Sequence, residues 1–126
     1  MKEFSITWKG SSKPNKQRKY RAKAPLHIKQ EFVSSHLAKD IRKKIGMRSL
    51  GVRKGDSVKV MRGKFRKHTG KVERVDLKKT RIFVTGAEAT KKDGTKKMIA
   101  IHPSNLMITD LNLDDKSRQK IMERKK

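Results

Sequence analysis

Short stretches of alternating apolar and polar residues dominate the second half of the chain. Between residues 52 and 110 they predict five β-strands, at 57–61, 70–76, 81–85, 98–101 and 106–108. Turn-forming sequences such as Lys54-Gly55-Asp56 and Asp93-Gly94 separate them. Val75 breaks the alternation that Val72 begins, which indicates a β-bulge. Strands this short and closely spaced predict a mainly β fold, a small SH3-like barrel.

A helical period precedes the predicted strands. Leu37, Ile41 and Ile45 recur at every fourth position and form one apolar stripe. We therefore expect a short helix over residues 34–46 that packs on the barrel. Ser34 or Ser35 is a candidate N-cap, and Gly46 follows the last apolar residue at the position where a left-handed C-cap is expected.

The two ends of the chain differ in pattern. Residues 1–33 show no sustained period, and prolines at 14 and 25 oppose one continuous helix, so we expect an extended basic arm that orders on its partner. Near the other end, Asp114 and Asp115 are cap candidates for a short helix over Lys116–Glu123. The expected organisation is an arm over 1–33, a helix over 34–46, a barrel over 47–110 and a tail over 111–126.

The composition indicates a polyanionic partner. The 126 residues include 36 Lys and Arg against 12 Asp and Glu, which gives a formal net charge of +24. A compact domain of that charge would repel itself, so we expect it to work while neutralised by a nucleic acid. Only 33% of the residues are hydrophobic, enough for one small core but too little to bury the whole chain.

The sequence lacks the residue patterns of metal-binding sites, catalytic sites and membrane-spanning segments. The chain has no cysteine, and its four histidines, at 27, 36, 68 and 102, have no partner at metal-ligand spacing. Capping explains the adjacent carboxylates of Asp114 and Asp115 better than acid–base catalysis does. The longest apolar run, Met98–Ile101, is far short of a membrane span, and no signal peptide is visible. We therefore expect no enzymatic activity, cofactor, metal, small-molecule substrate or membrane partner.

The densest candidate site lies between the first two predicted strands, in the basic loop of residues 62–71. Its cations are expected to contact sugar-phosphate: Arg62, Lys64, Arg66, Lys67 and Lys71. Gly63 and Gly70 would permit positive φ and close backbone approach. His68 and Thr69 would hydrogen-bond 2′-hydroxyls or base edges. Phe65 would either stack on a base or anchor the loop to the body.

The stretch from Lys54 to Gly86 resembles a KOW motif, a short RNA-associated β unit of ribosomal proteins and transcription elongation factors. Further matching segments are Pro14–Lys19, Ala24–His27, His36-Leu37, Arg48–Leu50, Val52–Asp56, Ile101–Asn105 and Leu113–Lys116. Together, residues 14–126 resemble the universal large-subunit ribosomal protein family L-twenty-four, called L-twenty-six in eukaryotes, in its archaeal and eukaryotic form. Gly51 departs from the pattern, because a proline is common there.

The resemblance implies a protein that binds large-subunit rRNA directly, near its 5′ region, and assists early subunit assembly. It also implies a cytoplasmic location on the large ribosomal subunit, near the polypeptide exit tunnel and beside neighbouring large-subunit proteins. Outside the basic loop, the candidate rRNA-binding residues are Asn15, Lys16, Arg18, Lys19, Arg21, His27, Arg42, Lys43, Arg48, Lys54, His102, Ser104 and Asn105.

Several residues allow two interpretations. Tyr20 either stacks on a base or covers the apolar rim of the barrel, and Lys43 suits a helix dipole nearly as well as an RNA contact. Lys78 and Lys79 are expected on a solvated face, and the 87–97 loop faces either RNA or solvent. The alternative function is a KOW-containing transcription elongation or RNA-binding factor. Such factors generally carry another folded domain upstream, for which residues 1–33 are too basic and aperiodic.

Overall fold

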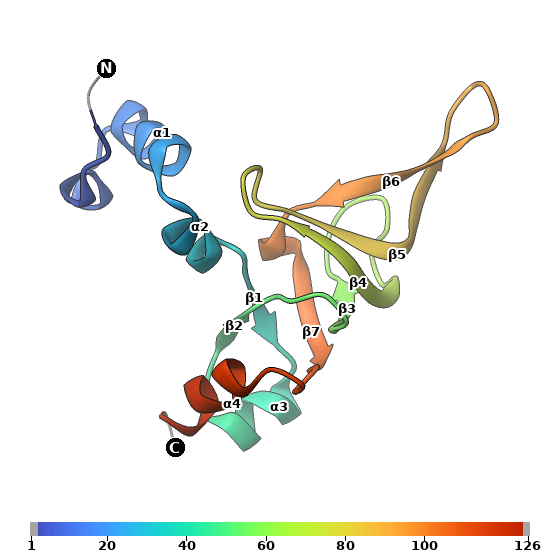
Figure 1. The fold of residues 1–126 in the computed structure, drawn as a ribbon. Helices are drawn as coiled ribbons and strands as arrows, with labels where there is room; N and C mark the ends of the chain where they lie inside the picture. The colour runs from blue at the N-terminus through green and yellow to red at the C-terminus, as the bar shows by residue number, and fades with distance from the viewer. Residues whose placement is uncertain (1–2, 125–126) are drawn as a thin grey trace.

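The computed structural model describes residues 3–124 of the chain. Its helical elements are η1 (Ile6–Gly10), α1 (Pro14–Lys23), α2 (Leu26–Phe32), α3 (Lys39–Ile45), η2 (Pro103–Asn105) and α4 (Lys116–Glu123). Its strands are β1 (Ser34–Leu37), β2 (Ser49–Gly51), β3 (Ser57–Val60), β4 (Thr69–Asp76), β5 (Arg81–Thr90), β6 (Lys96–Ile101) and β7 (Leu106–Asp110). In Figure 1 the N-terminal helices lead away from the sheet, while α3 and α4 lie together at its other end.

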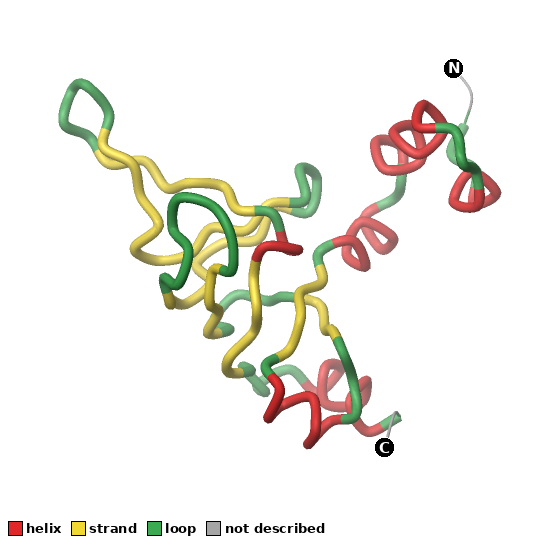
Figure 2. Tube along the Cα trace, turned by 180° about the vertical axis from the view of Figure 1, so that it is seen from behind, coloured by secondary structure: helices red, strands yellow, loops and turns green. Residues whose placement is uncertain are grey.

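The strands form one open sheet in the order β2-β1-β7-β3-β4-β5-β6. All neighbours pair antiparallel except β1 and β7, which run parallel with His36 opposite Met107 and Leu37 opposite Ile108. Because β2 and β6 are both edges, the mainly β class is found but the closed SH3-like barrel is not confirmed. Figure 2 shows the β5–β6 hairpin extending from the sheet on the side away from the arm.

Alternate positions of the strands supply the core. Val58 and Val60 of β3 and Ile82 and Val84 of β5 are all almost fully buried. The register of β4 shifts between Val72 and Arg74, which confirms the predicted irregularity in this strand. Residues 69–71 of β4 pair with β3, and residues 72–76 pair with β5 on both sides of the shift. The bulge therefore lies next to the point where β4 changes partner, and a bulge bends its strand and increases its twist.

The five predicted strands are confirmed as β3 to β7, although β5 and β6 are longer than expected. They reach Thr90 and Lys96, so the loop expected over 87–97 is largely a β-hairpin. At its tip the Lys91 amide donates a hydrogen bond to the Thr95 carbonyl at 2.8 Å. Extended pairing with β6 accounts for the extra length, which the polar residues of this region do not signal.

The prediction of one helix over residues 34–46 is wrong. Its first part is β1, and α3 begins only at Lys39. Ser35, a predicted cap, is instead buried, and its hydroxyl donates to the Pro103 carbonyl at 2.7 Å. Leu37 enters the core from a strand, because pairing with β2 and β7 outweighs its helical spacing to the residues of α3. Gly46 is confirmed as the C-cap of α3, with φ 73°.

The arm is helical where an extended chain was expected. As predicted, no single helix spans it, but the two prolines begin helices instead of preventing them. Pro14 is the first residue of α1, where a missing amide hydrogen breaks no helical bond, and Pro25 is the N-cap of α2. The Gln17 side-chain amide holds η1 against α1 by donating to the carbonyls of Trp8, Lys9 and Ser11 at 3.3, 2.9 and 2.7 Å. Residues 1 and 2 of the predicted arm lie outside the described residues.

Tyr20 is the packing centre of the arm and is only 5% exposed. Its ring lies between those of Phe4 and Phe32, at centroid distances of 5.3 and 5.8 Å. Aromatic pairs at such distances contribute packing energy beyond the area that they bury. Neither expectation for Tyr20 is met, because its ring is unavailable to a base and packs within the arm.

The tail contains the predicted helix. Asp115 is confirmed as the N-cap of α4, since its carboxylate accepts a hydrogen bond from the Ser117 amide at 2.8 Å. The apolar residues of this helix are only partly covered: Met122 packs against the core, while Ile121 is exposed. The buried residue of α4 is Arg118. Residues 125 and 126 of the predicted tail lie outside the described part of the chain.

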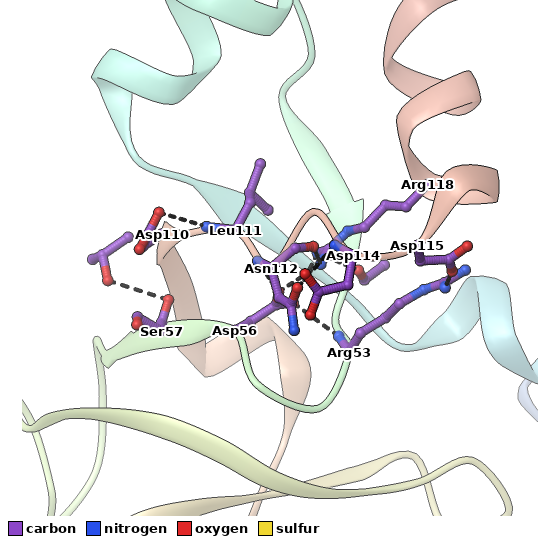
Figure 3. A network of polar contacts seen from close by, with 11 residues as sticks. Arg53, Asp56, Ser57, Asp110, Leu111, Asn112, Asp114, Asp115 and Arg118 are labelled. Carbon is purple, nitrogen blue, oxygen red and sulfur yellow. Dashed lines mark hydrogen bonds and ion pairs between the residues drawn. The ribbon is translucent and has the colours of Figure 1, made fainter.

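A buried ion pair joins the tail to the sheet (Figure 3). Arg118 and Asp56 are 1% and 0% exposed, and the guanidinium donates to both carboxylate oxygens at 2.5 and 2.8 Å. It also donates to the carbonyls of Asn112 and Gly51 at 2.9 and 3.1 Å. Asp56 further accepts from the amides of Arg53 and Asn112 at 2.9 and 3.0 Å. One carboxylate therefore fixes both the turn before β3 and the position of α4.

Candidate nucleic-acid interface

The loop between β3 and β4 is closed by backbone hydrogen bonds. At its base the Val60 amide donates to the His68 carbonyl at 2.8 Å, and the Lys67 amide donates to the Val60 carbonyl at 2.9 Å. The Met61 amide donates to the Asn105 carbonyl at 2.7 Å, which joins the loop to η2. The predicted site at Asn105 thus has a main-chain role in holding the basic loop.

Two side chains anchor the basic loop to the sheet. Phe65 is half-buried and packs against the core, so the structure favours the anchoring role over base stacking. Nε2 of His68 lies 2.8 Å from the Thr85 carbonyl oxygen, which can only accept, so Nε2 carries the hydrogen. The His68 ring also lies against Gly86, where an added Cβ would approach Cε1 to 2.8 Å. Only Nδ1 of His68 remains available to RNA.

The cations of the basic loop are all exposed: Arg62, Lys64, Arg66, Lys67 and, in β4, Lys71. Thr69 is exposed beside them. Gly63 has φ 90° and Lys67 φ 71°, so the chain reverses within the loop through left-handed residues. Because protein contacts already fix this backbone, a ligand would not have to order it, which lowers the entropic cost of binding.

Gly70 has a different role from the one expected. It lies within β4 and is not among the glycines with positive φ. A Cβ at this position would lie 2.5 Å from the Thr85 carbonyl oxygen and 3.0 Å from a methyl carbon of Val84. The expectation of positive φ is therefore wrong, and the close approach that Gly70 permits is to the neighbouring strand β5.

A second group of predicted residues meets at the C-terminus of α3. Arg42, Lys43 and Arg48 line one shallow groove together with Lys39, and all four are exposed. Positive charge near the last turn of a helix is favoured by the helix dipole, so Arg42 and Lys43 are stabilised there without a ligand, whereas Lys39 at the first position of α3 is not. Lys54 is exposed in the turn before β3, as expected for a residue that contacts RNA.

The third group combines the arm with η2. On the arm, Asn15, Lys16, Arg18, Lys19, Arg21 and His27 are all exposed. Arg18 and Arg21 line a groove that also contains His102. Lys78 and Lys79 are exposed, as expected for a solvated face, and they also line this groove. Sequence patterns do not indicate the groove, because the segments that line it are far apart along the chain.

His102 is held in one tautomer. The Ser104 amide donates to its Nδ1 at 3.3 Å, so Nδ1 accepts and the hydrogen is on Nε2. The exposed Ser104 hydroxyl lies 2.8 Å from the same nitrogen. Burial first, and then the positive charges of Arg81 and Arg21, lower the pKa of His102 below its ordinary value of 6.5. At neutral pH His102 is therefore an uncharged hydrogen-bond donor.

These groups offer exposed cations and N–H donors, the chemistry that recognises a sugar-phosphate backbone. Among residues 3–124, no three potential metal ligands of the His, Asp and Glu types lie close enough together to hold an ion. No helix in the described part of the chain has the length and apolar character that crossing a membrane requires.

Comparison with known protein families agrees with this geometry. The model of a family described as ribosomal proteins, L26 in eukaryotes and L-twenty-four in archaea, matches residues 11–125. The match includes α1, α2, the whole sheet and α4, so the tail and the part of the arm from residue 11 onward belong to the family pattern along with the KOW-like segment. It favours the ribosomal interpretation over an elongation factor. The chain therefore belongs to the family of ribosomal proteins that comprises L26 of eukaryotes and its archaeal counterpart, L-twenty-four.

Proposed function

We propose that this large-subunit ribosomal protein binds rRNA directly, with the basic loop of residues 62–71 as its central contact. The main support for the proposal is the structure of that loop. Its cations are exposed while its backbone is closed by hydrogen bonds and anchored by Phe65 and His68. A fixed array of cations binds phosphates at a smaller entropic cost than a flexible one.

The charge of the whole chain supports the same proposal. A net charge of +24 on 126 residues destabilises the compact state by self-repulsion, and a polyanion relieves that repulsion. The cations of α1 and of the α3 groove lie on other parts of the surface, so several RNA segments are within reach at once. Such a protein tethers segments of rRNA to one another, as a structural constituent of the subunit does.

We extend the proposal to the place and time of binding. The site is the 5′ region of large-subunit rRNA, near the polypeptide exit tunnel of the cytoplasmic ribosome and beside neighbouring large-subunit proteins. The protein's own contacts hold the basic loop in shape, so no other protein has to be present before RNA is bound. That independence suits a protein that acts early in subunit assembly. The mechanism is binding alone, because each contact is electrostatic or a hydrogen bond.

The proposal is tested by pairing a loop variant with a control of equal charge. The variant Lys64→Gln/Arg66→Gln removes two cations of the basic loop, and Lys116→Gln/Lys120→Gln removes two exposed cations of α4. Affinity for a folded fragment of the 5′ region of large-subunit rRNA is measured over a range of salt concentrations. Each lost phosphate contact lowers the slope of log affinity against log salt by about 0.7–0.9. The loop variant should show that loss and the control should not.

A second measurement locates the protein in the cell. We expect recovery with the large subunit on a high-salt sucrose gradient, with crosslinks from the basic loop to the 5′ region of its rRNA. Recovery at the top of the gradient, or crosslinks from the loop to another RNA, would contradict the proposal. Equal RNA affinity of the loop variant and the α4 control would contradict the central role of the loop.

A further inference from the structure

A groove separates the arm from the sheet, and its two walls come from segments far apart in the sequence. Figure 1 shows the β4–β5 turn reaching toward the arm. The groove has a volume of about 670 Å³, within the range of ordinary ligand sites. Six cations line it: Lys9, Arg18, Arg21, Lys78, Lys79 and Arg81. We call this space the arm–body groove.

The arm wall is fixed by contacts within the arm. Three hydrogen bonds from Gln17 hold η1 against α1, so Lys9 and the arginines of α1 share one side of the groove. Tyr20 and Phe32 line the same wall, with their rings packed edge to face. The side chains of these cations therefore extend from a part of the arm whose backbone and aromatic rings are held by packing and hydrogen bonds.

The body wall is equally well defined. The Lys79 amide donates to a carboxylate oxygen of Asp76 at 3.0 Å, which closes the β4–β5 turn, and Thr80 completes it with φ 54°. At the other side of this wall is His102, with its hydrogen on Nε2. Arg21 of the arm and Arg81 of β5 line the groove together with His102, and their charges contribute to the lowered pKa of that histidine.

The carboxylate of Asp76 lies at the β4–β5 turn beside Lys79, but Asp76 is not among the residues that line the groove. Among the described residues that line the groove there is neither Asp nor Glu, and within residues 3–124 none of the six cations forms an ion pair with a carboxylate. Six positive charges along a groove with no carboxylate in its lining repel one another, and that repulsion is relieved when an anion enters. The α4 region, by contrast, places carboxylates beside its cations, as the Arg53–Asp115 and Arg118–Asp56 pairs show.

We propose that the arm–body groove is a separate phosphate-backbone site, in which α1 and the β4–β5 turn grip one and the same segment of RNA. The proposal rests on the proposed function and adds a site built from cations that the basic loop does not contain. The lysines and arginines would contact successive phosphates, and Nε2 of His102 would donate to a phosphate or a 2′-hydroxyl oxygen. Binding would also hold the arm in its position against the sheet.

The first experiment compares three double variants on the folded 5′-region fragment of large-subunit rRNA. Lys78→Gln/Lys79→Gln changes the groove, Lys64→Gln/Arg66→Gln changes the basic loop, and Lys116→Gln/Lys120→Gln is the control on α4. The groove variant should lower the slope of log affinity against log salt by about 1.4–1.8, since each lysine contributes about 0.7–0.9. Circular dichroism spectra should be unchanged, because all six replaced side chains are exposed.

The outcomes separate the two proposals. If the wild-type protein shows no salt-dependent binding to the fragment, the proposed function fails and the groove assignment fails with it. If the loop variant loses affinity while the groove variant matches the α4 control, the groove assignment alone is overturned. A loss in both the loop and groove variants supports both proposals.

A crosslinking experiment tests whether both walls hold the same RNA segment. The chain contains no cysteine, so Lys9→Cys and Lys79→Cys each provide a unique thiol for a photoactivatable crosslinker. Crosslinks from the two positions should map to the same or adjacent nucleotides of the fragment. Crosslinks to distant nucleotides, or no crosslink from Lys79→Cys, would overturn the proposal.

Discussion

The pair of Arg118 and Asp56 offers the sharpest test of what holds the tail to the sheet. Replacing Arg118 with methionine keeps an apolar stem but leaves the carboxylate of Asp56, which is 0% exposed, without its counter-charge. Four hydrogen bonds are lost, to both carboxylate oxygens and to the carbonyls of Asn112 and Gly51. Breaking a buried pair by removing one partner costs about 3–5 kcal/mol. Since a domain's whole stability is about 5–15 kcal/mol, Arg118→Met should remove a large part of it.

The free energy of unfolding is best measured by urea titration followed by far-ultraviolet circular dichroism, without RNA. The single tryptophan, Trp8, lies in η1, so its fluorescence reports on the arm and not on this pair. Lys116→Met, at an exposed position of the same helix, is the matched control and should change stability by less than about 0.5 kcal/mol. Adding Asp56→Asn to Arg118→Met should cost less than the sum of the two single changes, because the charges no longer stand unpaired. A cost below about 1 kcal/mol for Arg118→Met would refute the reasoning.

Three further results are expected. Gly70→Ala should cost about 1–3 kcal/mol, because the new Cβ would lie 2.5 Å from the Thr85 carbonyl oxygen, and a urea midpoint equal to wild type would contradict that close approach. Phe65→Ala keeps every cation of the basic loop but should weaken rRNA binding severalfold. Because Phe65 is only half-buried, the loss of folding stability should be smaller than that for truncating a fully buried phenylalanine, which costs about 3–5 kcal/mol. Unchanged affinity would mean that the loop needs no anchor. NMR titration should give His102 a pKa below 6.5, and Arg81→Gln should raise that pKa. Because the folded state favours the neutral ring, stability is highest above the pKa of the unfolded state and is lost as the pH falls from there through the lower pKa of the folded state. A measured His102 pKa above 6.5 in the free protein would contradict this expectation.

The strands from residue 57 onward could be predicted because each is a local pattern bounded by turn residues. Val58 and Val60 alternate within one strand, and the turn before them contains Gly55 with φ 91°. The same holds for α4, whose cap and charge pattern lie within a few residues of one another. For such elements, short-range chemistry and tertiary packing favour the same structure.

Elements that depend on distant partners were mispredicted. Ser34–Leu37 has no strong strand pattern of its own, and Leu37 happens to stand in helical register with the apolar residues of α3. It is a strand because β2 and β7 supply its hydrogen-bonding partners. Arg118 was overlooked for the same reason, since a single arginine in a polar helix gives no sign that its counter-charge lies at Asp56.

Part of the candidate site likewise could not be predicted from the sequence. The basic loop stands out because its cations are close together along the chain, and the structure brings them to one exposed segment. The arm–body groove is assembled from η1, α1, the β4–β5 turn and η2, and none of these segments is distinctive alone. Lys78 and Lys79 look like ordinary turn lysines until the arm is placed opposite them.

The parallel pairing of β1 with β7 constrains the order in which the molecule is completed. Met107 and Ile108 are the parallel partners of His36 and Leu37, so this pairing cannot form until the ribosome has translated every strand from β2 to β7. Contacts between residues so far apart in sequence also form slowly, since a long loop must close before they are gained. In the meantime the nascent chain carries unpaired strand edges and a large positive charge, which favours early capture by RNA or by a chaperone. Arg118 is translated later still, so the buried ion pair forms after the last strand has emerged.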